Sequence, residues 1–264
     1  MEGNSQRPDV MQGKGLPEIA GVALCRRGGL IASLAARCTT PPHLPEGAML
    51  TEASAGTTGL LQDHVGLWDW RRRIAELYAE IRAFDDPEFA WRLWRDTRDE
   101  LFRAHAQSPL DEHRRRDFAG LALFDYDPAL RCVVELAPAP EVEAHSLSGG
   151  RDGYVQLIPF ARTEGLGSRL GGELTLYWLG GYGGGVFLPF RDATTGAATF
   201  GGGRYLLDGI KGADLGMDAQ GRAILDFNFA YNPSCAYSAR WICPLAPPEN
   251  TLPVAIHAGE RLSG

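Results

Sequence analysis

The stretch Glu173–Phe190, ELTLYWLGGYGGGVFLPF, decides the fold class of this chain. Its first half alternates apolar and polar residues with a period of two, which predicts a half-buried β-strand with Leu174, Leu176 and Trp178 on one face. Glycines fill five of the six positions 180–185, and glycine adopts positive φ freely, as a tight hairpin turn requires. Because the apolar run VFLPF follows, the stretch predicts two antiparallel strands joined by a glycine-rich turn.

Strand patterns continue on both sides of this hairpin. Further strands are predicted at 121–126, 132–136, 154–160 and 222–228. The first two flank Asp127-Pro128 and are expected to pair with each other. A turn at 218–221 precedes the last one.

Helical periodicity is confined to the region before Asp117. Apolar residues three and four positions apart predict one face of a first helix, formed by Trp70, Ile74, Leu77, Ile81 and Phe84. Asp86 followed by Pro87 is typical of an N-cap and a first-turn proline, and 108–111 predicts the start of a short third helix that runs through Arg116. Since helical and strand patterns are segregated, we expect a mainly β (α+β) fold, with an antiparallel β-barrel or sandwich and an N-terminal helical pair or trio packed against it.

The domain organisation follows from the same patterns. Residues 1–60 lack sustained periodicity and are interrupted by Pro and Gly, so we interpret them as a disordered or mis-annotated extension, with Met49 as an alternative start. Residues 61–264 are expected to form a single globular domain, helical over 61–117 and β-rich over 118–264.

Composition restricts the partners and the compartment. The net charge of −7 argues against a nucleic-acid partner, which would require a basic surface. No apolar run approaches the ~18 residues of a membrane span, so no membrane partner is expected. Five cysteines are too few for a disulfide scaffold and favour a soluble protein of the reducing cytoplasm. Arg26-Arg27 before the short apolar run 28–36 leaves an export signal open as the alternative.

Several chemical signatures are missing from the sequence. It contains no Gly-Lys-Ser/Thr triplet of a P-loop, no dinucleotide-binding Gly-x-Gly-x-x-Gly, no His-Glu-x-x-His and no Gly-x-Ser-x-Gly. These absences argue against nucleotide-dependent phosphoryl transfer and standard serine-hydrolase chemistry. No cofactor is predicted.

Polar and aromatic motifs are concentrated between Phe190 and Glu260. In chain order they are FRDATTG (190–196), GRYL (203–206), LDFNFAYNPSCAY (225–237), CP (243–244), PEN (248–250) and AGE (258–260). In this combination the chain closely resembles a prokaryotic family of unknown function (domain of unknown function one-six-eight-four). The resemblance extends more loosely through 95–102 and 108–110. It implies a shared fold and assigns no catalytic residues.

The polar side chains of this segment allow two interpretations, because they are costly to bury without partners. In the structural one, Arg204 pairs with Asp192 or Asp226 while asparagines satisfy backbone groups in turns. In the functional one, a pocket at the barrel mouth binds a small polar or anionic molecule, with Asp226, Arg204 and Cys235 as catalytic candidates. The ligand-binding candidates are then Asp192, Arg204, Tyr205, Asn228, Tyr231, Asn232, Glu249 and Asn250.

Three further features receive structural interpretations. Cys235 and Cys243 are eight residues apart with His257 downstream, a wider spacing than most zinc pairs, so no metal is predicted and free thiols are expected. A disulfide between them would require export. His105 is interpreted as a helix cap. The helical spacing of the tryptophans assigns them first to the core, namely Trp68, Trp70, Trp91 and Trp94.

Two classes of function therefore stay open. One is an enzyme of hydrolase type acting on a small polar substrate. The alternative is a non-catalytic β-rich module that binds a ligand or a protein and whose polar motif is structural. A carboxylate or cysteine with a shifted pKa in a cleft would favour the enzyme, and a fully paired network away from a cavity would favour the module.

Overall fold

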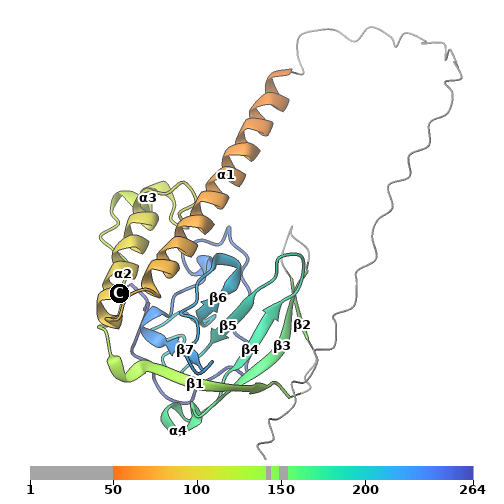
Figure 1. Ribbon diagram of the computed structural model, residues 1–264. Coiled ribbons are helices and arrows are strands. Elements are labelled where there is room, and N and C mark those ends of the chain that lie inside the picture. The colour runs from red at the N-terminus through yellow and green to blue at the C-terminus, as the bar shows by residue number, and fades with distance from the viewer. Residues whose placement is uncertain (1–49, 141–143, 149–153, 264) are drawn as a thin grey trace, which may run out of the picture. The chain divides into compact units, whose positions relative to one another are not determined.

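The computed structural model describes residues 50–140, 144–148 and 154–263 (Figure 1). Three helices come first: α1 (Leu50–Ile81), α2 (Pro87–Ala104) and α3 (Glu112–Arg116). The start of α1 lies inside the stretch 1–60 that the sequence assigned to an extension, because the helix continues toward the N-terminus beyond its apolar periodicity. The rest of that stretch, with Arg26-Arg27 and Met49, lies outside the described residues. No helix in the described ranges is both long and apolar enough to cross a membrane.

The helix starts follow the sequence signals. A carboxylate oxygen of Asp86 accepts from the backbone N–H groups of Glu88 and Phe89 at 3.0 and 3.1 Å, and Pro87 is the first helical residue. Asp111 caps α3 in the same way, accepting from the N–H of Arg114. Capping satisfies donors that have no partner within the helix, so these ends are specified locally.

Seven antiparallel strands form one sheet in the order β6-β5-β4-β3-β1-β7, with β2 paired on β3. The strands are β1 (Arg131–Pro138), β2 (His145–Ser148), β3 (Tyr154–Glu164), β4 (Thr175–Leu179), β5 (Val186–Phe190), β6 (Arg204–Asp208) and β7 (Ala223–Asp226). A short helix, α4 (Gly167–Leu170), connects β3 to β4. Single 3-10 turns are η1 (Pro128–Leu130), η3 (Gly209–Lys211), η4 (Phe227–Phe229) and η5 (Ser234–Ala236).

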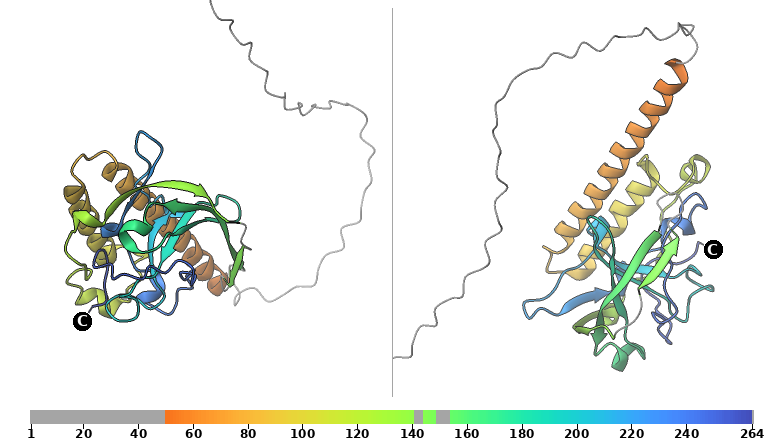
Figure 2. Two further views of the ribbon diagram at one scale, coloured as in Figure 1. Left: turned by 90° about the horizontal axis from the view of Figure 1, so that it is seen from below. Right: turned by 90° about the vertical axis from the view of Figure 1, so that its right-hand side faces the viewer.

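The sheet nearly closes into a barrel. Its two outer strands, β6 and β7, are joined through the chain that follows β7, because Tyr205 and Tyr231 exchange backbone hydrogen bonds of 2.8 and 3.0 Å. Figure 2 shows the strands curling around with α1 and α2 lying side by side along them. This arrangement confirms the fold class expected from the sequence.

The hairpin predicted from Glu173–Phe190 is present as β4 and β5, but the side chains of β4 do not alternate throughout. Tyr177 is fully buried, whereas Trp178 is 46% exposed, the reverse of the expected faces. The register of β3 against β4 shifts between Pro159 and Ala161, opposite this position. A bulge adds one residue to one strand and re-aims its neighbours, which the sequence of β4 alone does not reveal.

The strand pair predicted around Asp127-Pro128 does not form. Residues 121–126 instead run beside the C-terminal residues, where Phe124 donates its N–H to the carbonyl of Gly259 at 3.0 Å. β1 pairs with β3 and β7. The alternating pattern of residues 121–126 therefore predicted extended backbone, but the partner expected for this segment was wrong.

Two clusters make up the hydrophobic core. One fills the barrel between β1, β4, β5, β6 and β7, with Leu188, Phe190, Leu225 and Phe227 at its centre. The other lies between the helices and the barrel and includes Tyr78, Trp94, Phe229 and Tyr231. Of the four tryptophans assigned to the core, Trp91 and Trp94 are buried, Trp70 is half-buried and Trp68 is exposed. The second cluster forms the floor of the cavity described next.

Candidate functional site

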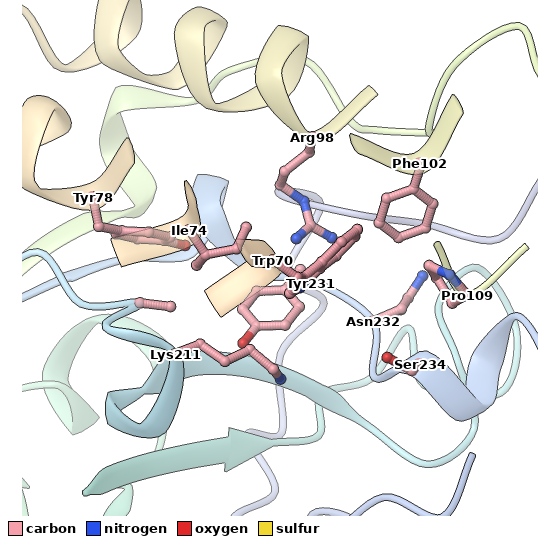
Figure 3. Close-up of a pocket in the computed structure, with 11 residues that line it drawn as sticks. Trp70, Ile74, Tyr78, Arg98, Phe102, Pro109, Lys211, Tyr231, Asn232 and Ser234 are labelled. Carbon is pink, nitrogen blue, oxygen red and sulfur yellow. The ribbon is translucent and has the colours of Figure 1, made fainter. Parts of the chain in front are cut away.

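A cleft opens where α1 and α2 meet the barrel, and we call it the helix–barrel cleft. Its inner chamber is small, with a cavity volume of ≈ 30 Å³, and is lined by Trp70, Ile74, Tyr78, Arg98, Phe102, Pro109, Lys211, Ala213, Tyr231, Asn232 and Ser234 (Figure 3). An adjoining outer chamber is larger, with a volume of ≈ 340 Å³. The two share Trp70, Lys211 and Ser234, so we treat them as one cleft.

The outer chamber is mostly apolar. Its walls include Leu179, Phe187, Tyr205, Ile242 and Pro244, and its charged residues are Arg71, Asp208 and Lys211. Ligand sites in proteins combine a largely apolar wall with a few convergent polar groups, and a volume of several hundred Å³ is typical of them.

A chain of polar contacts runs along the base of the cleft. Lys211 follows β6 directly and its ammonium pairs with Asp208 at 2.6 Å. The other partner of Asp208 is Tyr231, whose hydroxyl donates to the same carboxylate at 3.0 Å. Burial, reinforced by the Asp208 charge, raises the pKa of Tyr231 well above its usual value. Tyr231 is therefore a neutral hydrogen-bond donor, held in place by a carboxylate.

Arg98 forms the other side of the inner chamber. It is buried, and its guanidinium pairs with Glu260 near the end of the chain. Its guanidinium carbon also lies 4.8 Å from the ring centre of Tyr231, and Figure 3 shows the side chain reaching from α2 toward Trp70 and Tyr231. The second oxygen of Glu260 accepts the N–H of Asn232 at 2.8 Å and the hydroxyl of Tyr237 at 2.5 Å. This network fixes the backbone where Asn232 enters the cleft.

Two buried polar atoms in the cleft walls have no hydrogen-bond partner among the described residues. They are the side-chain oxygen Oδ1 of Asn232, in the inner chamber, and the indole Nε1 of Trp241, in the outer one. Two more such atoms among the described residues, the Nε of Arg191 and the Nε of Arg204, lie outside the cleft. Buried polar groups are nearly always hydrogen-bonded, so each of the two atoms in the cleft can bond a ligand group or water. One atom is an acceptor and the other a donor.

The sequence-predicted pair around Arg204 lies in the barrel core rather than in the cleft. Arg204 is 1% exposed and donates to Asp192 at 2.7 Å. It also donates to the backbone carbonyls of Ile256, Ala258 and Glu260. Asp192 accepts in addition from the backbone and hydroxyl of Thr194. These contacts match the structural interpretation of the motif.

Asp226 and Asn228 form a second internal network. Asp226 is fully buried and accepts from the backbone and side-chain amides of Asn228 at 3.0 and 2.8 Å. Asn228 in turn exchanges two hydrogen bonds with the backbone of Asp127. Burial raises the pKa of the Asp226 carboxyl, although Asn228 and Arg131 act against the shift. The network ties the end of β7 to the turn before β1.

The predicted pair Glu249 and Asn250 is divided between surface and core. Asn250 is buried, bonding both backbone groups of Thr175 and the carbonyl of Pro189. Glu249 is exposed and accepts from Tyr177 at 2.9 Å, while the His145 ring lies 2.6 Å away. Of the described residues that line the cleft, three belong to the predicted set: Tyr205, Tyr231 and Asn232.

The predicted cysteine and histidine features are also located. Cys235 and Cys243 are half-buried free thiols side by side, and Cys243 lines the outer chamber. His257 packs on Phe124 instead. Within the described ranges, no cluster of three or more His, Cys, Asp or Glu side chains could hold a metal ion. His105 ends α2 as its C-cap residue and contacts Asp69 at 3.1 Å.

Two of three comparisons with known proteins found a match. The profile of a family described as "Protein of unknown function (DUF1684)" matches residues 116–261. The chain belongs to the DUF1684 family. The solution NMR structure of an uncharacterized protein from Haloarcula marismortui is 34% identical, covering 66% of this chain and 94% of that one with a TM-score of 0.46. No curated protein matches the chain.

The part of the chain matched to DUF1684 supplies only one side of the cleft. Trp70 and Arg98 come from the helices before residue 116, and sequence reasoning did not select Lys211, Ser234 or Trp241. Lys211 lies outside every motif, and Ser234 lies within the 225–237 motif but was not selected among its polar residues. Arg98 was noticed only within the looser family resemblance.

Proposed function

We propose that the helix–barrel cleft binds a small amphipathic molecule that carries an anionic group. The observation that supports this most directly is that Lys211 and Ser234, an ammonium and a hydroxyl, line both chambers. The unpartnered Oδ1 of Asn232, a buried acceptor in the wall of the inner chamber, can accept from a donor group of the same ligand. Leaving such an acceptor unpaired costs about 1–3 kcal/mol, and a hydroxyl or amine of a ligand would remove that cost.

The polar end of the ligand is assigned to the junction of the two chambers, beside Lys211. Lys211 is the more accessible of the two cations of the inner chamber, because Arg98 is enclosed by aromatic rings and neutralised by Glu260. The ammonium of Lys211 and the hydroxyl of Ser234 lie where the two chambers meet. A carboxylate, sulfonate or phosphate placed there would accept from both, and charge-assisted hydrogen bonds are the strong ones.

The apolar body of the ligand is assigned to the outer chamber. Phe187, Leu179 and Ile242 offer it apolar surface, while the unpartnered Nε1 of Trp241 supplies one donor. Two cations line this chamber, Arg71 and Lys211, against the single carboxylate of Asp208. That balance favours an anion over a cation, although the chain as a whole carries −7.

In this proposal the polar C-terminal motif is mainly scaffold. Arg204, Asp192, Asp226, Asn228 and Asn250 bond one another or backbone groups, as the non-catalytic alternative expects. Tyr205, Tyr231 and Asn232 keep the ligand-binding role given to them by the sequence. The proposal therefore places this chain among binding modules rather than hydrolases.

The experiment uses an amphipathic aromatic sulfonate, 8-anilinonaphthalene-1-sulfonate, as the probe, with fluorescence as the readout. N-phenyl-1-naphthylamine, which lacks the sulfonate, is the matched neutral probe. We expect the sulfonate to bind the native protein, and Lys211→Met to weaken it about 5–10-fold, because roughly 1 kcal/mol of charge-assisted binding is lost. Affinity for the neutral probe should change little.

An exposed ion pair away from the cleft provides the control. Arg92 pairs with Glu88 on the outer face of α2, so Arg92→Met removes one cation without touching the cleft. Equal affinities of Lys211→Met and Arg92→Met for the sulfonate would contradict the proposal. So would the absence of sulfonate binding to the native protein.

A further inference from the structure

The two half-buried thiols beside the outer chamber suggest redox chemistry that is independent of the ligand proposal. Cys235 belongs to η5 and Cys243 to the segment that lines the chamber with Trp241, Ile242 and Pro244. The backbone N–H of Cys235 donates to the Sγ of Cys243 at 3.4 Å, which makes the two cysteines neighbours in the fold. The fold thus brings together two sulfurs that the sequence separates by eight positions.

We propose that Cys235 and Cys243 form a reversible intramolecular disulfide by exchange with a small disulfide that enters through the outer chamber. Cys243 is the attacking residue and Cys235 the resolving one. A permanent bridge would require export, whereas a reversible disulfide does not, and the pair gives the chain a dithiol site at the wall of its cleft.

The geometry distinguishes the two roles. Cys243 lines the chamber, where an incoming disulfide can reach it, and its sulfur receives the backbone N–H hydrogen bond of Cys235. Cys235 is less suited to attack, since burial and the neighbouring Cys243 both raise the pKa of its thiol. The segment that carries both cysteines is anchored on either side. The hydroxyl of Tyr205 donates to the carbonyl of Pro244 at 2.5 Å, and the N–H of Asn232 to Glu260.

The exchange has two steps that balance in atoms and electrons. The Cys243 thiolate attacks one sulfur of the small disulfide, which forms a mixed disulfide and releases one small thiolate. Cys235 then loses its proton to solvent and attacks the Sγ of Cys243, which releases the second small thiolate. The two protein thiols are oxidised, and the small disulfide is reduced to two thiols.

Cys132 serves as an internal reference. It is a fully buried thiol on β1, packed in the barrel core, and burial raises its pKa. A buried, uncharged thiol in apolar surroundings reacts slowly. Oxidation of the native chain should therefore consume two thiols of the three described, and Cys132 should not be one of them.

The test uses the chain with Cys25→Ser and Cys38→Ser, so that only these three cysteines are present. The folded protein is equilibrated with bis(2-hydroxyethyl) disulfide and 2-mercaptoethanol at fixed ratios, quenched with acid, and analysed by peptide mass. We expect a Cys235–Cys243 disulfide whose equilibrium constant is about tenfold or more larger in the folded chain than in urea. An equal or smaller constant in the folded chain would overturn the proposal.

Two serine variants test the assigned roles. In Cys235→Ser the mixed disulfide on Cys243 has no resolving thiol, so it should accumulate. In Cys243→Ser the remaining Cys235 should be modified about tenfold more slowly, because its thiol is the poorer nucleophile. Faster modification of Cys235 than of Cys243 would overturn the assignment. Far-UV circular dichroism checks that both variants are folded.

Discussion

The guanidinium of Arg98 and the carboxylate of Glu260 meet in the interior although 162 residues separate them in the chain. The Nε of Arg98 donates to Oε1 of Glu260 at 3.1 Å, and both side chains are buried. The other oxygen of Glu260 holds the N–H of Asn232. One ion pair therefore connects α2, the cleft and the C-terminal residues.

Removing either member of this pair should destabilise the fold strongly. We expect Glu260→Gln or Arg98→Met to lower the free energy of unfolding by about 3–5 kcal/mol, because each leaves a buried charge without its counterion. The double variant should recover about 1–3 kcal/mol of the summed loss, since neither charge is then left alone. Urea unfolding of the four proteins gives the coupling energy. Strict additivity would contradict the role assigned to the pair.

Variants of Arg204 can distinguish a structural role of this side chain from a ligand-binding role. We expect Arg204→Ala to cost about 3–5 kcal/mol, because Asp192 is left buried and alone. Arg204→Lys should rescue little of this loss, since an ammonium cannot reproduce the planar fork that reaches Asp192 and three carbonyls. Thermal unfolding measures both. Unchanged or increased stability of Arg204→Ala would indicate a site that awaits an anion.

Asp226 should make stability depend on pH in an identifiable direction. Burial raises the pKa of Asp226 in the folded chain. Its contribution to stability is therefore fully present below the unfolded pKa of 3.8 and is lost as pH rises through the folded pKa. An asparagine does not titrate. The free energy of unfolding of Asp226→Asn minus that of the native protein should therefore be larger at pH 7 than at pH 4. Urea unfolding at both pH values measures this difference. A difference independent of pH would contradict the raised pKa.

Glu249 should show the opposite sign. Burial works against ionisation, but hydrogen bonds from its own backbone, from Tyr177 and from His145 lower its pKa below the usual value. The contribution of Glu249 to stability is present above the unfolded pKa and is lost as pH falls through the folded pKa. Glu249→Gln should consequently cost more stability at pH 6 than at pH 3. The effect should be small, because the side chain is 41% exposed and screened by solvent.

Gly259 and Gly221 form a matched pair for testing close backbone approach. Both have positive φ, at +72° and +80°, but a Cβ at Gly259 would lie 2.3 Å from the carbonyl oxygen of Ala230, whereas none of the described atoms lies within 4 Å at Gly221. Gly221→Ala should cost about 1–2 kcal/mol from φ alone. Gly259→Ala should cost roughly 2–5 kcal/mol, because overpacking adds to that strain. Similar thermal shifts in the two variants would contradict this account.

Local signals in the sequence were sufficient to predict the elements that are determined by neighbouring residues. The Asp86 cap, the glycine turn between β4 and β5, and the separation of helices from strands were all predicted correctly. The pairing of residues 121–126 was not, because their partners include Gly259, far along the chain. A period of two specifies extended backbone but not the strand beside it.

The candidate site was less accessible to sequence reasoning for the same reason. Arg204 and Asp192 were selected because a costly buried charge needs a partner, and they do pair. The cleft, however, brings together Trp70 from α1, Lys211 after β6 and Ser234 after η4. None of these residues is unusual in its own neighbourhood, and only the closing of the sheet against the helices makes them neighbours.

The position of residues 258–260 also has a consequence for synthesis on the ribosome. The carbonyls of Ala258 and Glu260 help to hold Arg204, and the carboxylate of Glu260 neutralises Arg98. A nascent chain that has emerged only as far as β7 lacks these partners, so Arg98 has no counterion and Arg204 keeps only its pair with Asp192. Folding of this domain should therefore be completed only once residues 258–260 have been synthesised, and a nonsense codon just before them should be as damaging as the loss of a whole strand.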